Sequence, residues 1–478
     1  MKKISCTTLP VLIAIASFAA SNAYRAESKL LETDAKSTPP NIILILADDA
    51  GYADFGFYHE ADEAPFKKIT PALDRLIEQG AFFNNAYVSA SVCGPSRAGL
   101  ITGRYQQRFG WYQNEPNYWS KPPHPDWQSD DWKVFGLDVA EETIGDHLKA
   151  SGYTTGIIGK WHLGYGEEHY PNIRGFDYFF GMRGGARDYF SRPQYNTTER
   201  IPFNWRSLEE DGKIFPEEHT YYVTDLLTDK GIQFIEANKD RPFFLFISHI
   251  APHSPMQADS ARLDRAKELF PDADINRQKL VAMTLAMDEG IGQVMDKLEE
   301  LALSERTLVV FLNDNGGSTH NHTDNGKLRG YKWSPYEGGL RVPMAFYWKE
   351  KIPAQVIDTP VISLDLTPTF LELAGQTDTS AKALDGTSLL PVLLEGESLP
   401  QRPLFWKERN REGWTSIVRL GDWKLIDYDN KRKALYNLTE DIGEKYNQIT
   451  EKPQIAQKLS ELLDDWEAIT ATPRWPIN

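Results

Sequence analysis

Short runs of apolar residues alternate with longer amphipathic stretches through the first three quarters of the chain. The apolar runs have the length of strands covered on both faces, and they occupy residues 41–47, 81–88, 154–158, 243–248 and 307–312. The amphipathic stretches are typical of helices, and they occupy residues 71–79, 141–150, 221–237 and 275–303. This alternation predicts an α/β fold with a large, mostly parallel sheet flanked by helices, over residues 38–375.

The pattern changes after about residue 375. Short segments at residues 414–420, 423–428 and 434–437 are separated by tight turns and predict antiparallel strands. A last amphipathic helix is expected at residues 455–466. We therefore predict that residues 376–478 form a smaller C-terminal α+β domain containing an antiparallel sheet.

The beginning of the chain has the features of an export signal. Lys2 and Lys3 precede an apolar run at residues 9–20, and a small-x-small cleavage motif, Ser-Asn-Ala, follows at residues 21–23. We expect residues 1–23 to be a bacterial signal peptide, residues 24–37 to be a polar lead-in, and the mature protein to be periplasmic or secreted. No later segment has the roughly 20 apolar residues that a membrane-spanning helix needs.

The net charge narrows the choice of partners. The 478 residues carry a formal charge of −16, so the chain lacks the overall basic character of nucleic-acid-binding proteins, and we expect no nucleic-acid partner. A polyanionic substrate stays compatible with this charge only if cations gather locally. Arg97, Lys160 and Lys332 are the candidates for such a cluster.

Cys93 is the only cysteine after the expected signal peptide. It follows the strand at residues 81–88, and a short helix opened by Pro95 and closed by Gly103 comes next. Free backbone N–H groups at such a turn favour an anion, and Arg97 adds a planar donor group one turn later. The structural alternative is a buried cysteine beside a structural arginine. A tyrosine-phosphatase loop is excluded, because it needs arginine at position 99, which is glycine here.

Two polar pairs follow predicted strands. Asp48 and Asp49 end the first strand, and Asp314 and Asn315 end the strand at residues 307–312. Ligands collect at the carboxyl ends of parallel strands, so these pairs are expected to meet. Carboxylate and amide oxygens suit Ca²⁺ or Mg²⁺ better than zinc, whereas an isolated Asp-Asp pair would more often cap a loop or a helix.

The run Cys-Gly-Pro-Ser-Arg at residues 93–97, followed by Leu-Ile-Thr-Gly at residues 100–103, resembles the signature of the formylglycine-dependent sulfatases, which have the alkaline-phosphatase-like fold. Gly-Lys-Trp-His-Leu-Gly at residues 159–164 and Pro-His-Ser-Pro at residues 252–255 resemble further motifs of that family. Its opening segment is similar to residues 46–54. The resemblance extends from residue 41 to about residue 345.

The resemblance implies a role for each matching residue. Cys93 would be converted to formylglycine by a maturation enzyme, and hydrated formylglycine would attack the sulfur. Asp48, Asp49, Asp314 and Asn315 would bind one Ca²⁺, and Arg97, Lys160 and Lys332 would hold the sulfate. His162 would serve the formylglycine hydroxyl, and His253 would assist the leaving alcohol.

Specificity is expected outside these motifs, in three places. The segment at residues 316–331 carries His320, His322 and Arg329, a glycine-rich stretch carries Arg183 and Arg187, and an aromatic-rich stretch at residues 105–132 includes Trp111 and also Tyr118, Trp119 and Trp127. Aromatic faces bind the apolar faces of sugar rings, although such a stretch is as often a packed lid. We expect a sulfated polysaccharide or its oligosaccharides as substrate, whether an algal galactan such as carrageenan, ulvan or a glycosaminoglycan.

Two alternatives remain at this point. A phosphonate or phosphate ester hydrolase of the same superfamily shares the cysteine turn, but such relatives tend to have Asp-His where this chain has Asp314 and Asn315. A non-catalytic polysaccharide-binding protein is the other alternative, and intact Cys93, His162 and His253 disfavour it. The sequence does not predict the oligomeric state.

Overall fold

The apolar runs form an eleven-stranded mixed sheet in the computed structural model, which describes residues 39–60, 62–114, 135–191, 206–216, 221–376, 383–410 and 413–475. The strands are β1 (Asn41–Ala47), β2 (Ala81–Tyr87), β3 (Thr154–Lys160), β4 (Tyr178–Met182), β5 (Glu209–Glu210), β6 (Lys213–Ile214), β7 (Phe243–Ser248), β8 (Thr307–Asn313), β9 (Arg341–Tyr347), β10 (Gln355–Ile357) and β11 (Val361–Ile362). Their order is β10-β2-β9-β8-β1-β7-β3-β4-β5-β6, and β11 also pairs with β2. The expected signal peptide, the polar lead-in and the aromatic residues Tyr118, Trp119 and Trp127 lie outside the described residues.

The centre of the sheet is parallel, as predicted. β8, β1, β7 and β3 are neighbours and run in one direction. β9 differs, because it is antiparallel to both β2 and β8. The hydrophobic pattern does not predict this strand, since Arg341 and Pro343 interrupt its apolar run even though all seven residues are buried.

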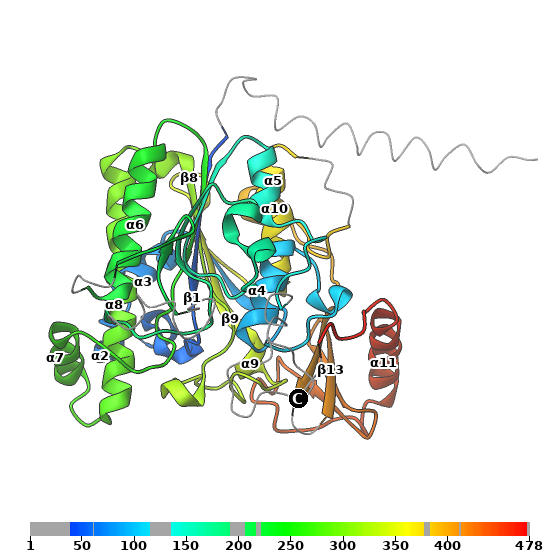
Figure 1. Ribbon diagram of the computed structural model, residues 1–478. Coiled ribbons are helices and arrows are strands. Elements are labelled where there is room, and N and C mark those ends of the chain that lie inside the picture. Colours follow the sequence, from blue (N-terminus) through cyan, green and yellow to red (C-terminus); the bar gives the residue numbers. More distant parts are fainter. Residues whose placement is uncertain are drawn as a thin grey trace, which may run out of the picture. The chain divides into compact units, whose positions relative to one another are not determined.

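Helices cover both faces of the sheet. They are α2 (Ala64–Lys67), α3 (Pro71–Glu78), α4 (Cys93–Thr102), α5 (Ile144–Ala150), α6 (Val223–Asn238), α7 (Ser260–Leu269), α8 (Ile275–Glu300), α9 (Glu337–Leu340), α10 (Leu366–Leu373) and α11 (Pro453–Glu467). Figure 1 shows α3, α6 and α8 on one face and α4, α5 and α10 on the other. Alternate side chains of β1 point to opposite faces of the sheet. Ile42 and Leu44 belong to the hydrophobic cluster that includes α4 and α5. Ile43 and Ile45 belong to the cluster that includes α6 and α8.

The helix after β2 begins two residues earlier than predicted. α4 starts at Cys93, because the N–H of Ser96 already donates to the carbonyl of Val92. Pro95 is tolerated inside this first turn, where backbone N–H groups have no partner within the helix. The helix ends at Gly103, whose φ of 63° is left-handed, as the sequence predicts.

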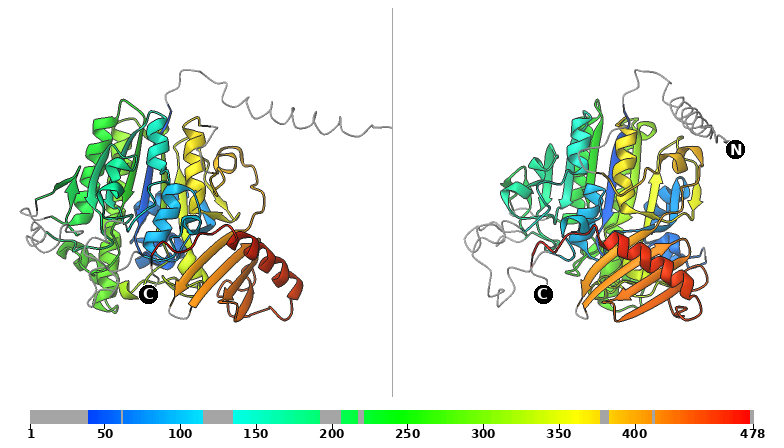
Figure 2. Two further views of the ribbon diagram at one scale, coloured as in Figure 1. Left: turned by 45° about the vertical axis from the view of Figure 1, so that its right-hand side comes forward. Right: turned by 90° about the vertical axis from the view of Figure 1, so that its right-hand side faces the viewer.

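A second sheet occupies the C-terminal part of the chain. It consists of β12 (Leu404–Asn410), β13 (Gly413–Leu420), β14 (Trp423–Tyr428) and β15 (Arg432–Asn437), paired antiparallel in sequence order. Figure 2 shows α11, in red, lying across one face of this sheet, where Leu459 and Leu463 pack with Ile417 of β13. The predicted antiparallel sheet is thus present, with β12 in addition. No helix within the described ranges is both long and apolar enough to cross a bilayer.

Two glycines allow the sheet to close tightly beside the ends of its central strands. A Cβ atom at Gly181 of β4 would lie 1.9 Å from the carbonyl oxygen of Gly159 in β3. Gly159 itself has a φ of 112°, and a Cβ atom there would lie 1.9 Å from the carbonyl oxygen of Ser248 in β7. Both close contacts are with backbone, so only glycine fits without moving a strand.

We predict that Gly181→Ala destabilises the protein by about 3 kcal/mol and lowers its melting temperature, because the added methyl group must displace β3. Gly292→Ala is the matched control. Gly292 lies within α8, where the new Cβ would lie 3.4 Å from the Cβ of Ala72. The control should therefore be neutral, or stabilising by about 0.5–1 kcal/mol. Thermal and denaturant unfolding of both variants measure this, and equal stabilities would contradict the steric argument.

Candidate functional site

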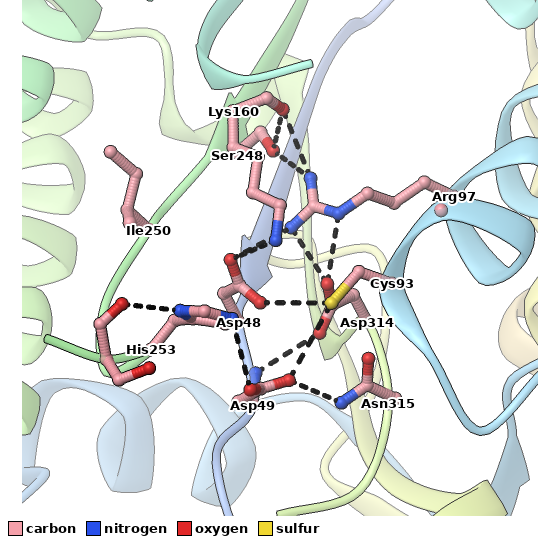
Figure 3. Close-up of polar contacts among 12 residues, drawn as sticks. Asp48, Asp49, Cys93, Arg97, Lys160, Ser248, Ile250, His253, Asp314 and Asn315 are labelled. Atoms are coloured by element: carbon pink, nitrogen blue, oxygen red, sulfur yellow. Dashed lines mark hydrogen bonds and ion pairs between the residues drawn. The ribbon is translucent and has the colours of Figure 1, made fainter. Parts of the chain in front are cut away.

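Polar side chains from four neighbouring strands converge at one edge of the large sheet (Figure 3). Asp48 and Asp49 follow β1, Lys160 ends β3, Ser248 ends β7, and Asp314 follows β8. These strands are parallel and adjacent, so their carboxyl ends lie together. The convergence that the sequence predicts for the two polar pairs is therefore observed.

Cys93 lies at the centre of this group. Its Sγ atom is 3.8 Å from Oδ1 of Asp48 and 3.8 Å from Oδ1 of Asp49. The Nζ atom of Lys332 is 2.9 Å from the same sulfur. At the N-terminus of α4, the N–H of Gly94 donates to Oδ1 of Asn114. The thiol is buried, free of any disulfide, and surrounded by groups of both charges.

Three cations balance the three carboxylates. Arg97 donates to Oδ2 of Asp314 at 3.0 Å, and Nζ of Lys160 lies 2.6 Å from Oδ2 of Asp48. Nζ of Lys332 contacts both carboxylate oxygens of Asp49, at 2.7 and 2.9 Å. An unpaired charge would be costly at this depth, so each ion depends on its partner.

The pKa shifts reflect the same balance. Burial raises the pKa of the Cys93 thiol to about 12, although Lys160 and Lys332 oppose the shift. Burial also favours the neutral form of Asp49, but Lys332, His253 and Lys160 outweigh it and hold the pKa of this carboxyl well below its usual range. For Asp314 burial and the nearby charge of Asp48 prevail, and its pKa is raised.

The donor set fits a hard divalent cation. Asp48, Asp49 and Asp314 supply carboxylate oxygens, and Asp48, Asp49, Cys93 and His253 each place a ligand atom within 4.8 Å of the others. Among the described residues, Oδ1 of Asn315 is buried without a hydrogen-bond partner, while its Nδ2 donates to Asp49 at 2.7 Å. Asn315 therefore has an oxygen to spare for a metal ion, and oxygen ligands of this kind suit Ca²⁺ or Mg²⁺.

His253 stands on the loop after β7 and faces the cluster. Its Nδ1 lies 2.6 Å from the carbonyl oxygen of Ser254, which only accepts, so this nitrogen carries the proton. Its Nε2 lies 3.4 Å from Oδ2 of Asp49. Burial lowers the pKa of this imidazole to about 3, despite the opposing charge of Asp49.

His162 lies two residues beyond Lys160 in the loop after β3. Its φ of 56° is left-handed, and its backbone N–H donates to the carbonyl of Arg183 at 3.2 Å. The imidazole packs so closely on Gly185 that a Cβ atom there would lie 2.7 Å from Nε2. Contacts with Arg183 and Gly185 therefore hold His162 in place, two residues along the chain from Lys160.

The arginines and the tryptophan predicted to bind substrate are in contact with other residues of the chain. Arg183 pairs with Glu209 at 3.2 Å, and the guanidinium of Arg187 is buried and donates to the carbonyl of Asp188. Trp111 is fully buried in the core against Trp475, so no face of its indole is open to a sugar ring. The sequence does not predict this burial, because aromatic and glycine-rich patterns do not distinguish buried from exposed side chains.

The predicted residues of the 316–331 segment lie on its outer side. His320 is exposed, and Nδ1 of His322 lies 3.8 Å from Asp274, before the start of α8. Arg329 donates to the carbonyl oxygen of Glu444 and stacks 3.8 Å over the ring of Tyr336. Within the described part of the chain, none of the three forms a hydrogen bond or an ion pair with Cys93, the three carboxylates or the cations around them.

Three residues that the sequence does not single out hold the cluster. Oγ of Ser248 accepts from Arg97 at 2.6 Å and donates to the carbonyl of Lys160 at 2.6 Å. Asn321 links Oδ2 of Asp49, at 3.3 Å, to the backbone N–H of Ser254. Glu408 of β12 accepts from the hydroxyl of Ser91 at 2.6 Å, two residues before Cys93. Two of them could have been suspected from the sequence by position alone, because Ser248 ends a predicted strand and Asn321 lies between two histidines.

Comparisons with known proteins agree with this arrangement. The family described as Sulfatase matches residues 40–376, and the family described as N-sulphoglucosamine sulphohydrolase, C-terminal, matches residues 331–470. Human N-acetylgalactosamine-6-sulfatase is 32% identical over 383 residues, which cover 77% of this chain and 68% of that protein.

Solved structures extend the likeness to the whole fold. The crystal structure of Ps i-CgsB in complex with k-i-k-neocarrahexaose superposes with a TM-score of 0.82 at 33% identity, covering 92% of this chain and 95% of that one. The phosphonate monoester hydrolase of Agrobacterium radiobacter shares the fold at 16% identity, with a TM-score of 0.63 and coverage of 90% and 95%. From the match over residues 40–376 and the shared fold, the chain belongs to the sulfatase family and is a sulfuric ester hydrolase.

Proposed function

We propose that this enzyme removes sulfate esters from a sulfated polysaccharide or its oligosaccharides, using formylglycine formed from Cys93 and one Ca²⁺. The observation that carries the proposal is the position of Cys93, whose sulfur is surrounded by Asp48, Asp49 and Lys332. The glycan class is supported by two similar proteins, one named as an N-acetylgalactosamine-6-sulfatase and one crystallised with a neocarrahexaose.

The three cations are suited to holding a sulfate group. Lys332 reaches the sulfur of Cys93, and Lys160 and Arg97 lie beside Asp48 in the same buried cluster. Because these charges are fixed by their carboxylate partners, they need no reorganisation when negative charge develops on the ester oxygens. When bound to Asp48, Asp49, Asp314 and Asn315, Ca²⁺ would add positive charge that the protein alone does not supply.

The remaining steps fall to the two histidines. Hydrated formylglycine would supply the hydroxyl that attacks sulfur, in place of the protonated thiol. His253 keeps a proton on Nδ1 and presents Nε2 toward Asp49, so we assign it to the departing alcohol: Nε2 would first take up a proton and would then pass it to the leaving oxygen as the S–O bond breaks. His162 is assigned to the second formylglycine hydroxyl, whose deprotonation expels sulfate.

We further propose the organisation that the sequence predicts around this site: a signal peptide at residues 1–23, a polar lead-in at residues 24–37, a catalytic domain at residues 38–375 and a C-terminal domain at residues 376–478. Export would place the enzyme in the periplasm or outside the cell. A formylglycine-generating enzyme would be its maturation partner.

The test of the proposed activity is desulfation of a panel of defined oligosaccharides from carrageenan, ulvan and chondroitin sulfate, alongside phosphate and phosphonate monoesters. We expect turnover of at least one sulfated oligosaccharide and much slower turnover of the phosphorus esters. Preference for a phosphonate would contradict the proposal.

We predict that Cys93 carries an aldehyde in the active enzyme. Peptide mass analysis of the active enzyme should show the aldehyde at this position, and Cys93→Ser should lose nearly all turnover because the serine side chain provides no aldehyde. Since serine is close in size to cysteine, the melting temperature should stay near that of the wild type. Active protein that carries only an unmodified thiol at residue 93 would contradict the assignment.

We predict that metal binding depends on Asp314. Asp314→Asn should lower both the calcium content and the activity, because it removes one of the three carboxylates. Asp296→Asn, at an exposed side chain on α8, is the control and should change neither. Elemental analysis measures the metal content. A pair of zinc ions in the wild type would instead favour a phosphoesterase.

We predict that activity depends on Ser248, which holds Arg97. Ser248→Ala removes a hydrogen bond to a charged group, of a kind worth about 1.5–3 kcal/mol, so kcat/KM should fall by about 10-fold or more. Ser304→Ala is a matched control, since the Ser304 hydroxyl is buried without a hydrogen-bond partner in the described structure. An unchanged kcat/KM for Ser248→Ala would show that Arg97 needs no support from β7.

A further inference from the structure

Two exposed aromatic residues flank Lys332 in the loop before α9. Lys332 points inward, with its Nζ atom 2.9 Å from the sulfur of Cys93. Tyr331 and Trp333, on either side of it, are 38% and 46% exposed. An aromatic surface therefore borders the lysine that reaches the sulfate pocket.

The backbone of this segment is held on both sides. The N–H of Lys332 donates to the carbonyl of Gly317 at 2.8 Å, and the N–H of Trp333 donates to the carbonyl of Ser91 at 2.9 Å. Ser91 is in turn fixed by Glu408, so the loop is attached both to the 316–331 segment and to β12. The two aromatic side chains consequently have a fixed base close to Cys93.

Trp333 has an unusual backbone conformation for a large residue. Its φ of 70° is left-handed, which costs about 1–2 kcal/mol for a residue other than glycine. Burial offsets only part of this cost, since Trp333 is 46% exposed and leaves much of its apolar surface in water. A strained, exposed tryptophan beside the site is better explained by a ligand than by folding.

We propose that Trp333, together with Tyr331, is a stacking platform for a sugar ring of the substrate, at a position neighbouring the sulfate ester. The C–H face of a hexose is apolar and packs on an aromatic ring, while its hydroxyl groups stay in water. Consecutive Cα atoms are about 3.8 Å apart, so the backbone that carries the indole lies one residue from the lysine that contacts Cys93. This inference rests on the proposed function and specifies which residues bind the glycan.

The test compares two substrates. Trp333→Asn removes the ring and keeps a residue that tolerates left-handed backbone, whereas Trp333→Phe keeps part of the platform. The probe is whichever of a carrageenan hexasaccharide, an ulvan oligosaccharide and a chondroitin sulfate tetrasaccharide the wild type desulfates fastest, and 4-nitrophenyl sulfate is the small reference substrate. Val356→Ala is the control, because Val356 is 68% exposed on β10, which pairs with the start of β2, away from Cys93.

For Trp333→Asn we expect kcat/KM on the oligosaccharide to fall by about 10-fold, mainly through KM, with a change of about 2-fold or less on 4-nitrophenyl sulfate. The kcat/KM of Trp333→Phe on the oligosaccharide should lie between those of the wild type and Trp333→Asn. The kcat/KM of Val356→Ala should match that of the wild type. Calorimetric titration of the oligosaccharide into Cys93→Ser, with and without Trp333→Asn, measures binding alone. Adding Trp333→Asn should weaken the affinity by about the same factor as it raises KM.

Two results would overturn the platform while leaving the proposed function intact. Equal losses on both substrates would mean that Trp333 only positions Lys332, and no loss on either would mean that the glycan leaves the pocket in another direction. A wild-type enzyme that desulfates no sulfate ester would instead contradict the proposed function, and this inference with it.

Discussion

The structure depends on one electrostatic constraint: three carboxylates buried at the edge of a sheet need three buried cations. Asp48, Asp49 and Asp314 face Lys160, Lys332 and Arg97 in a cluster whose formal charges cancel. Removing any one partner would leave a buried charge without compensation, which costs several kcal/mol. The cluster is therefore stable as a set, and its arrangement is nearly complete before a substrate arrives.

The parallel sheet is what makes this set of charges possible. Asp48, Lys160 and Asp314 come from three strands whose carboxyl ends lie at one edge, and the close approach of β3, β4 and β7 at Gly159 and Gly181 sets the position of Lys160. Arg97 comes from α4 and depends on Ser248 as well as on its acidic partners. The same sheet geometry thus supplies both the anionic half of the site and the scaffold that holds the cationic half.

The sequence predicts strands whose apolar runs are continuous and misses a strand whose run is interrupted. Buried parallel strands are continuous apolar runs, so β1, β7 and β8 are found almost to the residue, whereas Arg341 and Pro343 hide β9. The residues of the cluster are predictable because they follow strands or lie in motifs. The burial of Trp111 and Arg187 is not predicted, because composition does not say on which side of a loop a side chain lies. Ser248 and Asn321 act through single hydrogen bonds between distant segments, and no local pattern encodes such a bond.

The C-terminal sheet contributes to the site through its contacts with the catalytic segments. Glu408 of β12 holds Ser91, and Lys424 of β14 pairs with Glu337 at 3.0 Å and with Glu444 at 2.9 Å, all of them buried. Burial raises the pKa of Glu444 to about 7, against the attraction of Lys424, so its ionisation is sensitive to how tightly this interface is packed. Because α9 begins at Glu337 and follows the Lys332 loop directly, the interface also sets the course of the chain that carries Trp333. The segment that carries Trp333 is thus positioned by both sheets together, whereas Asp48, Lys160 and Asp314 belong to the large sheet and the segments that follow its strands.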